Sequence, residues 1–170
     1  MRKEGYYERH LHPHERPQIR GQTRGKRENR EAAAGRFCRA VGGQPAALGI
    51  LCRDEAETIE ALAKTSPYAV SAAKAPVVLV IAARKDVIFP GITDIDCAIA
   101  TENLWLELEE LGLGGVMMAV SPVPDRIEKV GKILNLPDNQ YAFALLPFGY
   151  PVGKKPQVDR YDAKKIHWVE

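Results

Sequence analysis

The feature that most constrains the fold is an apolar run near the middle of the chain, PVVLVIAAR, at residues 76–84. Aliphatic residues, many of them β-branched, follow one another over the length of one strand without alternating with polar ones. A strand that is apolar on both sides has to be covered on both faces. The run therefore predicts a central buried strand in a layered fold of sheet and helices.

Helical and strand-like patterns alternate along the rest of the chain from residue 54 onward. Helices are predicted within residues 53–67, 68–75, 93–112 and 123–137, and further strands at 114–121 and 141–151. The last residues, 152–170, read as a polar, extended tail. This order predicts an α+β domain with helices packed on a sheet.

The longest helical pattern is TDIDCAIATENLWLELEELG, residues 93–112. Thr93 or Asp94 is expected to cap its N-terminus, and Gly112 is suited to the left-handed residue that follows a helix. Its buried face is expected to consist of Ile95, Ile99, Leu104 and Leu108.

The charge is divided unevenly, although the net charge is only +2. Residues 1–52 hold 11 Lys and Arg against 5 acidic residues, whereas residues 53–170 hold 13 against 17. A basic arm can bind nucleic acid, and a solvated or non-native segment is the alternative. We do not expect a nucleic-acid partner, because the arm has few aromatic residues besides Tyr6 and Tyr7 and no recognised binding motif. We expect no membrane partner, because no stretch approaches about 18 consecutive apolar residues and no secretory signal is present.

The three cysteines, Cys38, Cys52 and Cys97, show neither metal-site spacing nor a disulfide-rich count, so a reducing cytoplasm is expected. Cys52 and Cys97 are interpreted as buried thiols, since no histidine motif accompanies them. His10, His12 and His14 alternate and could face one metal ion on a strand. They lack partner ligands, and we predict no metal site.

The glycine-rich pieces GGQP and GLGG match no phosphate-binding loop or dinucleotide fingerprint. Gly112 to Gly115 allow a helix end and a close approach of the backbone to something flat. In the tail, Lys154, Lys155 and Arg160 suit a phosphate group or form an ordinary solvated charge run.

Residues 54–170 resemble the flavin-dependent nitroreductase family. The resemblance rests on APVVLVIAARKD, DIDCAIATENLWLELEELGLGG, KILNLPDNQYAFALLPFGYP and KKPQVDRYD with the later IHW. It implies an FMN-binding fold with a mainly antiparallel sheet and an intertwined homodimer with the flavin at the subunit interface. It also implies hydride transfer from NAD(P)H through flavin N5 to nitroaromatics or quinone-like acceptors.

The resemblance also implies the site residues, with no catalytic side chain because the flavin carries the chemistry. Met118 and Ala119 are expected to make main-chain contacts with the ring system, and Gly114 and Gly115 to allow its approach. Arg160 is expected to bind the FMN phosphate, with Lys155 as a second candidate. The family usually has Trp and Gly where Met117 and Ala119 stand.

The N-terminal motifs of the family are absent from residues 1–52. Reverse translation of residues 14–52, read one base later, can spell a phosphate-binding stretch, an amphipathic helix and PSAGNQQPW in family-like order. We therefore predict a frameshift between about Tyr6 and Arg53, with residues 1–52 aberrant and 53–170 the C-terminal part of the domain. The alternatives are an inactive, flavin-poor remnant or a domain with a basic nucleic-acid-binding arm.

Overall fold

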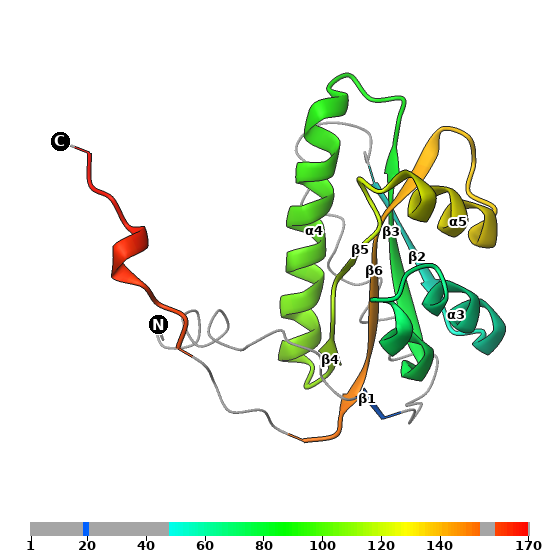
Figure 1. Cartoon of the computed structure of the whole chain (residues 1–170), viewed down its shortest axis with the longest axis horizontal. Coiled ribbons are helices and arrows are strands. Elements are labelled where there is room, and N and C mark those ends of the chain that lie inside the picture. The colour runs from blue at the N-terminus through cyan, green and yellow to red at the C-terminus, as the bar shows by residue number, and fades with distance from the viewer. Residues whose placement is uncertain (1–18, 21–47, 154–158, 170) are drawn as a thin grey trace.

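The computed structural model of the chain describes residues 19–20, 48–153 and 159–169. A six-stranded sheet lies at its centre, with β1-β6-β3-β2 in order and β4 and β5 also paired with β6 (Figure 1). The strands are β1 (Ile19–Arg20), β2 (Leu48–Arg53), β3 (Val77–Arg84), β4 (Gly114–Gly115), β5 (Met118–Ala119) and β6 (Gln140–Pro151). Every described pairing is antiparallel, so the predicted α+β fold with a mainly antiparallel sheet is confirmed.

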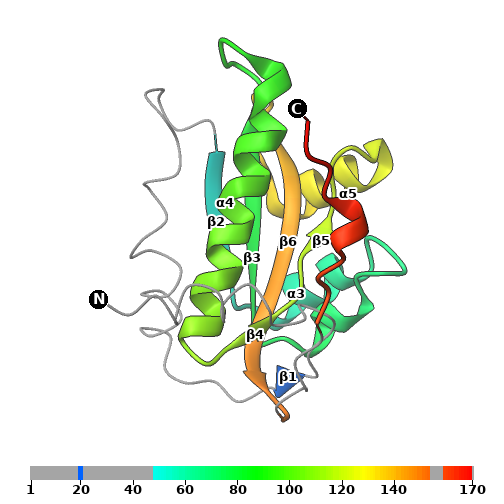
Figure 2. The ribbon, with the colours of Figure 1, turned by 90° about the vertical axis from the view of Figure 1, so that its left-hand side faces the viewer.

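Helices cover both faces of this sheet. The helical elements are α3 (Ala56–Ala63), η2 (Val70–Lys74), α4 (Pro90–Glu110), α5 (Pro124–Leu134) and η3 (Ala163–Lys165). Helix α4 runs along one face, and α3 and α5 lie on the other (Figures 1 and 2). This arrangement leaves β4 near the lower end of α4, and both β4 and β5 lie along β6 at one border of the sheet.

Strand β3 is buried along both of its sides, as the apolar run predicts. Leu79 and Ile81 belong to the core cluster under α4, whereas Val78 and Val80 belong to the cluster under α3 and α5. All four side chains are at most 1% exposed. The alternation follows from the two-residue period of a strand, which sends successive side chains to opposite faces.

The predicted start of the long helix is wrong. Helix α4 begins at Pro90, with Phe89 as its N-cap, so Thr93 and Asp94 lie inside the helix. A proline fits the first turn, where a backbone N–H has no intrahelical acceptor. The predicted end is confirmed, because Leu111 is the C-cap and Gly112 follows with a φ of +71°, which favours glycine.

The buried face of α4 is only half as predicted. Leu104 and Leu108 are buried, but Ile95 and Ile99 are 57% and 51% exposed. Cys97 and Ala100 instead continue the buried face toward the N-terminus. Together with Ile92, the two exposed isoleucines form a second row at spacings of three and four residues, the isoleucine stripe.

The predicted strand at 114–121 is divided into β4 and β5, with Val116 and Met117 between them. The amide of Val116 donates to the carbonyl of Pro147 at 3.2 Å. Pro147 has no N–H to return a second bond to the strand. The ladder with β6 is therefore weakened at this point.

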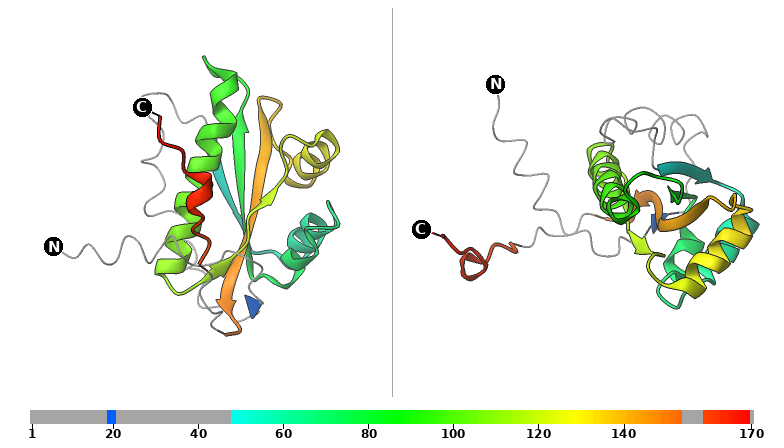
Figure 3. Two further views of the ribbon diagram at one scale, coloured as in Figure 1. Left: turned by 60° about the vertical axis from the view of Figure 1, so that its left-hand side comes forward. Right: turned by 90° about the horizontal axis from the view of Figure 1, so that it is seen from above.

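Strand β2 pairs with β3 over its whole length, from Leu48 opposite Ala83 to Arg53 opposite Val78. Most of β2 falls in the segment predicted to be aberrant, and the boundary at residue 53 stays a prediction. The final segment, 159–169, extends away from the sheet (Figure 1 and Figure 3, right). Within the described ranges, no helix is both long and apolar enough to cross a membrane.

Candidate functional site

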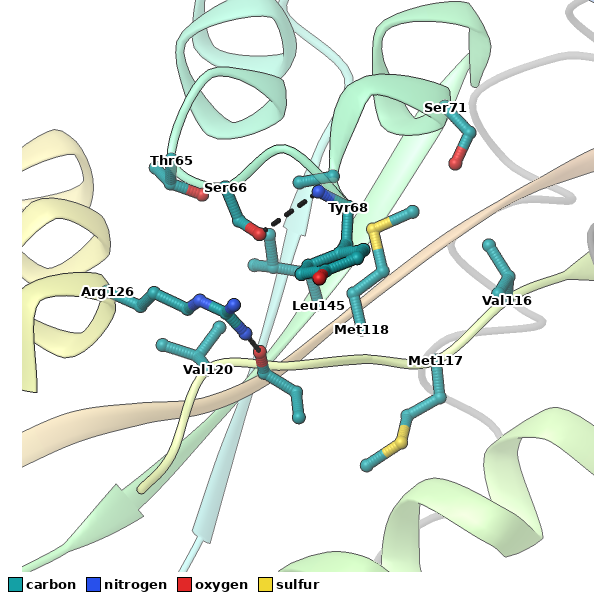
Figure 4. Close-up of a pocket in the computed structure, with 12 residues that line it drawn as sticks. Thr65, Ser66, Tyr68, Ser71, Val116, Met117, Met118, Val120, Arg126 and Leu145 are labelled. Carbon is teal, nitrogen blue, oxygen red and sulfur yellow. Dashed lines mark hydrogen bonds between the residues drawn. The ribbon is translucent and has the colours of Figure 1, made fainter. Parts of the chain in front are cut away.

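A cavity of about 280 Å³ opens beside β5, between the end of α3 and the start of α5 (Figure 4). Its walls come from four places in the chain: the end of α3 through the start of η2, the β4–β5 segment, α5 and β6. The lining residues are Thr65, Ser66, Tyr68, Ala69, Ser71, Val116, Met117, Met118, Ala119, Val120, Arg126 and Leu145. At about 280 Å³ the cavity is just below the roughly 300 Å³ at which ligand sites commonly start, so it suits part of a flat ring system.

One wall of the cavity is a sheet edge. Strand β5 pairs with β6 and with no other described strand. Met118 is half-buried and Ala119 is exposed, and both line the cavity. An edge strand presents backbone N–H and C=O groups to whatever lies beside it. The two residues predicted to make main-chain contacts therefore do lie at a cavity with an open backbone edge.

Arg126 connects the two sides of the cavity. Its Nη1 donates a hydrogen bond to the carbonyl oxygen of Ala119 at 3.2 Å. Its guanidinium carbon also lies 5.7 Å from the centre of the Tyr68 ring, within the range of a cation–π contact. The side chain thus crosses from α5 to β5 beneath Tyr68 (Figure 4).

Hydroxyl groups line the opposite wall. The Ser66 Oγ accepts a hydrogen bond from the Tyr68 amide at 3.2 Å, which fixes the turn that carries the ring. The Thr65 hydroxyl donates to the Leu62 carbonyl at 2.7 Å and so closes the last turn of α3. The Tyr68 side chain itself is 70% exposed. The cavity therefore combines an apolar floor with neutral polar groups and one cation.

Gly114 and Gly115 are near the cavity in sequence but do not line it. A Cβ at Gly115 would lie 3.2 Å from the Pro147 carbonyl oxygen and 3.3 Å from Leu108 Cδ1. The Gly115 carbonyl accepts a hydrogen bond from Trp105 Nε1 at 3.1 Å. The missing side chain at Gly115 is thus explained by close packing between α4 and β6.

The predicted phosphate-binding residues are not brought to the cavity within one described chain. Arg160 lies in the segment 159–169, which extends away from the body (Figure 3). Lys155 lies outside the described residues, and so do Lys154, His10, His12 and His14. In the part of the chain that is described, no three His, Cys, Asp or Glu side chains gather as metal ligands.

Cys97 is a buried thiol, as predicted. Its side chain is fully buried in the core under α4. Burial, together with the negative charges of Asp94 and Asp96, raises the pKa of this thiol to about 12. The thiol stays protonated at neutral pH and is a poor nucleophile. The burial of Cys52 and the position of Cys38 fall outside what is described.

A polar cluster fixes the chain just after β5. The Asp94 carboxylate accepts hydrogen bonds from Ser121 Oγ at 2.9 Å and from the Tyr141 hydroxyl at 2.5 Å. Burial, followed by the hydrogen bond to Asp94, raises the pKa of Tyr141. Because Asp94 is on α4, Ser121 follows β5 and Tyr141 is on β6, the cluster ties three elements together.

Three features of the site were missed by sequence reasoning: Ser66, Tyr68 and Arg126. Ser66 and Tyr68 flank Pro67, which indicates only a turn. Arg126 reads as an ordinary exposed residue in the first turn of an amphipathic helix. No local pattern signals any of the three, because their common position depends on how α3 and α5 pack on one face of the sheet.

Comparison with known proteins agrees with this fold. Residues 18–150 match the model of the nitroreductase family, a range that includes most of residues 1–52. A Methanothermobacter thermautotrophicus protein named "Putative NADH dehydrogenase/NAD(P)H nitroreductase" is 31% identical over 112 residues. That match covers 65% of this chain and 59% of the relative, so the chain spans less than two thirds of the relative's length.

Solved structures share this fold. A Bacteroides thetaiotaomicron protein of the same name superposes with a TM-score of 0.86 at 24% identity, over 98% of each chain. An FMN-dependent nitroreductase from Clostridium difficile superposes with a TM-score of 0.77 at 18% identity, over 92% of this chain and 96% of that one. With its antiparallel sheet, its covering helices and a family match over most of its length, the chain belongs to the nitroreductase family.

Proposed function

We propose that this protein is an FMN-dependent NAD(P)H oxidoreductase that reduces nitroaromatic or quinone-like acceptors. The observation that carries the proposal is the cavity along the open edge of β5. When bound, FMN would supply the hydride chemistry through its N5 atom. The cofactor is suggested by the FMN-dependent relative of the same fold and by the family resemblance.

The described residues fit the ring system of such a cofactor. Val116, Met118 and Leu145 offer an apolar surface, and the β5 backbone offers donors and acceptors at its edge. Met118 and Ala119 would hold the polar border of the ring through main-chain atoms.

We propose that the phosphate end is held by Arg160, with Lys155 as a second candidate, in a site shared between two copies. A guanidinium suits bidentate binding of phosphate. The segment that carries Arg160 extends away from its own body and ends in exposed apolar residues. Ile166, Trp168 and Val169 are 47%, 91% and 97% exposed. Such an arm is suited to dock on a second copy of the chain.

The isoleucine stripe of α4 supports the same homodimer. Ile92, Ile95 and Ile99 are each about half exposed, in a row along the outer side of the longest helix. Isolated exposed apolar residues need no explanation, but a row of them in a chain that also exposes apolar residues in segment 159–169 supports an interaction surface. We propose that two copies pack through α4 and exchange their C-terminal arms.

The cofactor proposal is tested by purifying the full chain, adding FMN, and measuring bound flavin and the oxidation of NADH and NADPH with a quinone. Ala119→Trp, which fills the cavity, is expected to weaken FMN binding by at least about 10-fold. Ala56→Trp, at an exposed position at the start of α3, serves as the control. Stoichiometric flavin that is insensitive to Ala119→Trp would contradict the placement of the ring.

The predicted frameshift in residues 1–52 needs a separate measurement. Intact mass of the purified protein is compared with the mass of this sequence, and the coding DNA is read again across the segment. A different mass with bound flavin supports a normal oxidoreductase. A matching mass without flavin supports the flavin-poor remnant, and binding to DNA that falls steeply with salt would support the basic arm instead.

A further inference from the structure

The positively charged side chain of Arg126 lines the cavity beside β5, next to mainly apolar residues. Arg126 is the only charged side chain among the described residues that line it. Its position is fixed at two points, by the hydrogen bond to the Ala119 carbonyl and by the Tyr68 ring. A long side chain that is held in place loses less conformational freedom when a ligand binds.

The positive charge of Arg126 is not neutralised by the protein within the described ranges. No carboxylate there forms an ion pair with it, and the nearby Glu128 pairs with Lys132 on the same helix. A guanidinium carries five N–H donors, of which the Ala119 contact uses one. Donors therefore remain for an anionic group that enters the cavity.

The surroundings of Arg126 suit an aromatic anion better than a compact one. Tyr68 lies over the guanidinium and beside the Met118 side chain (Figure 4). The hydroxyl of Ser66 lies on the same wall of the cavity. With the flavin ring along β5, a second flat ring could rest against the exposed Tyr68 at the mouth of the cavity, while its anionic substituent reaches the guanidinium.

We propose that the mouth of this cavity selects aromatic electron acceptors that carry a carboxylate, with Arg126 binding the carboxylate and Tyr68 contacting the ring. This rests on the proposed function, in which the acceptor is reduced beside β5. Arg126 is then a specificity-determining residue, and neutral acceptors of the same shape are weaker substrates.

The test compares para-nitrobenzoate with para-nitrobenzamide, which share the ring and the nitro group and differ in charge. In FMN-loaded protein, Arg126→Met is expected to lower the ratio of kcat/KM for the benzoate to kcat/KM for the benzamide by about 10-fold, because any effect on the flavin is common to both acceptors. Arg126→Lys should lie between, because an ammonium keeps the charge and loses the planar fork. Lys129→Met removes an equal charge from α5 outside the cavity and should change neither value.

A binding measurement separates this inference from the proposed function. Saturation-transfer NMR is recorded with benzoate and with benzamide on the wild type and on Arg126→Met. Arg126-dependent benzoate binding without turnover of either acceptor supports the site and contradicts the oxidoreductase. Turnover of both acceptors with an unchanged benzoate-to-benzamide ratio in Arg126→Met overturns the site and leaves the oxidoreductase standing. If Arg126→Met loses only the ability to use NADPH, Arg126 binds a phosphate of that co-substrate, and the proposed carboxylate site is also overturned.

Discussion

Gly115 and Gly131 show how differently two glycines of one chain depend on their surroundings. Gly115 is buried between α4 and β6, and a Cβ there would meet the Pro147 carbonyl oxygen and Leu108. Gly131 lies in α5, where a Cβ would meet nothing within 4 Å. The sequence alone indicates a flexible backbone at both positions. Only the packing shows that a side chain fits at Gly131 and not at Gly115.

Gly115→Ala is expected to lower the free energy of unfolding by about 1–3 kcal/mol, because the new methyl group would press on the Pro147 carbonyl and displacing that backbone costs energy. Gly131→Ala should instead raise it by up to about 1 kcal/mol, since alanine is the better helix former. Urea unfolding of both variants checks this pair. Equal effects at the two positions would show that the close contact at Gly115 is not what selects glycine.

Cys97 is expected to resist thiol reagents in the native protein. Burial and the neighbouring Asp94 and Asp96 raise its pKa to about 12, so the reactive thiolate is scarce near neutral pH. Labelling with a maleimide at pH 8, followed by peptide mass mapping, should find Cys97 unmodified until denaturant is added. Rapid labelling of Cys97 in the native state would contradict its place in the core.

At the scale of elements, α4 illustrates what a helical pattern leaves undecided. Its length and its C-terminal glycine were predicted, but its first turn and half of its buried face were not. Ile95 and Ile99 are more apolar than Cys97 and Ala100, yet the latter two face the sheet. The rotation of α4 about its axis is set by its contacts with β3 and β6, which the helix alone does not encode.

The Asp94 cluster, which joins α4 to β6 and to the residue after β5, should make stability depend on alkaline pH. The folded-state pKa of Tyr141 is raised above its ordinary value of about 10, so the folded state favours the protonated phenol. The contribution of the protonated Tyr141 to the free energy of unfolding is complete below pH of about 10. It is lost as the pH rises through the raised folded-state pKa of Tyr141.

Tyr141→Phe tests this, because it removes the titrating group and keeps the ring. The wild type should be more stable than the variant at pH 8, and the difference should shrink above pH of about 10. Urea unfolding across this range measures it, with Tyr161→Phe in the exposed tail as the control. A difference that stays constant with pH would contradict the link between the phenol and Asp94.

At the scale of the whole molecule, the isoleucine stripe and the apolar residues of segment 159–169 are left exposed by the part of the chain that the structure describes. If two copies pack through α4, Ile95→Glu should shift the protein from dimer to monomer, because it buries a charge in an apolar interface. Light scattering after size exclusion measures the mass. Val123→Glu, an exposed apolar position at the start of α5 on the opposite face, should leave the mass unchanged.

The sequence by itself determined the sequence of elements from residue 54 onward, the buried central strand and the resemblance to the nitroreductase family. The elements and the buried strand follow from local periodicity, because a two-residue or a 3.6-residue repeat can be recognised in consecutive residues. The resemblance rests instead on the sequence pieces that carry it. Through the family resemblance after the long helix, the sequence also predicted Met118 and Ala119 as main-chain contacts of the cofactor.

Only the tertiary structure decided that these two residues form an open sheet edge beside a cavity, and that Tyr68 and Arg126 complete it. Tyr68 and Arg126 lie far apart in the chain and belong to no shared motif. They meet because α3 and α5 pack on the same face of one sheet, and such long-range contacts depend on many residues that no local pattern records.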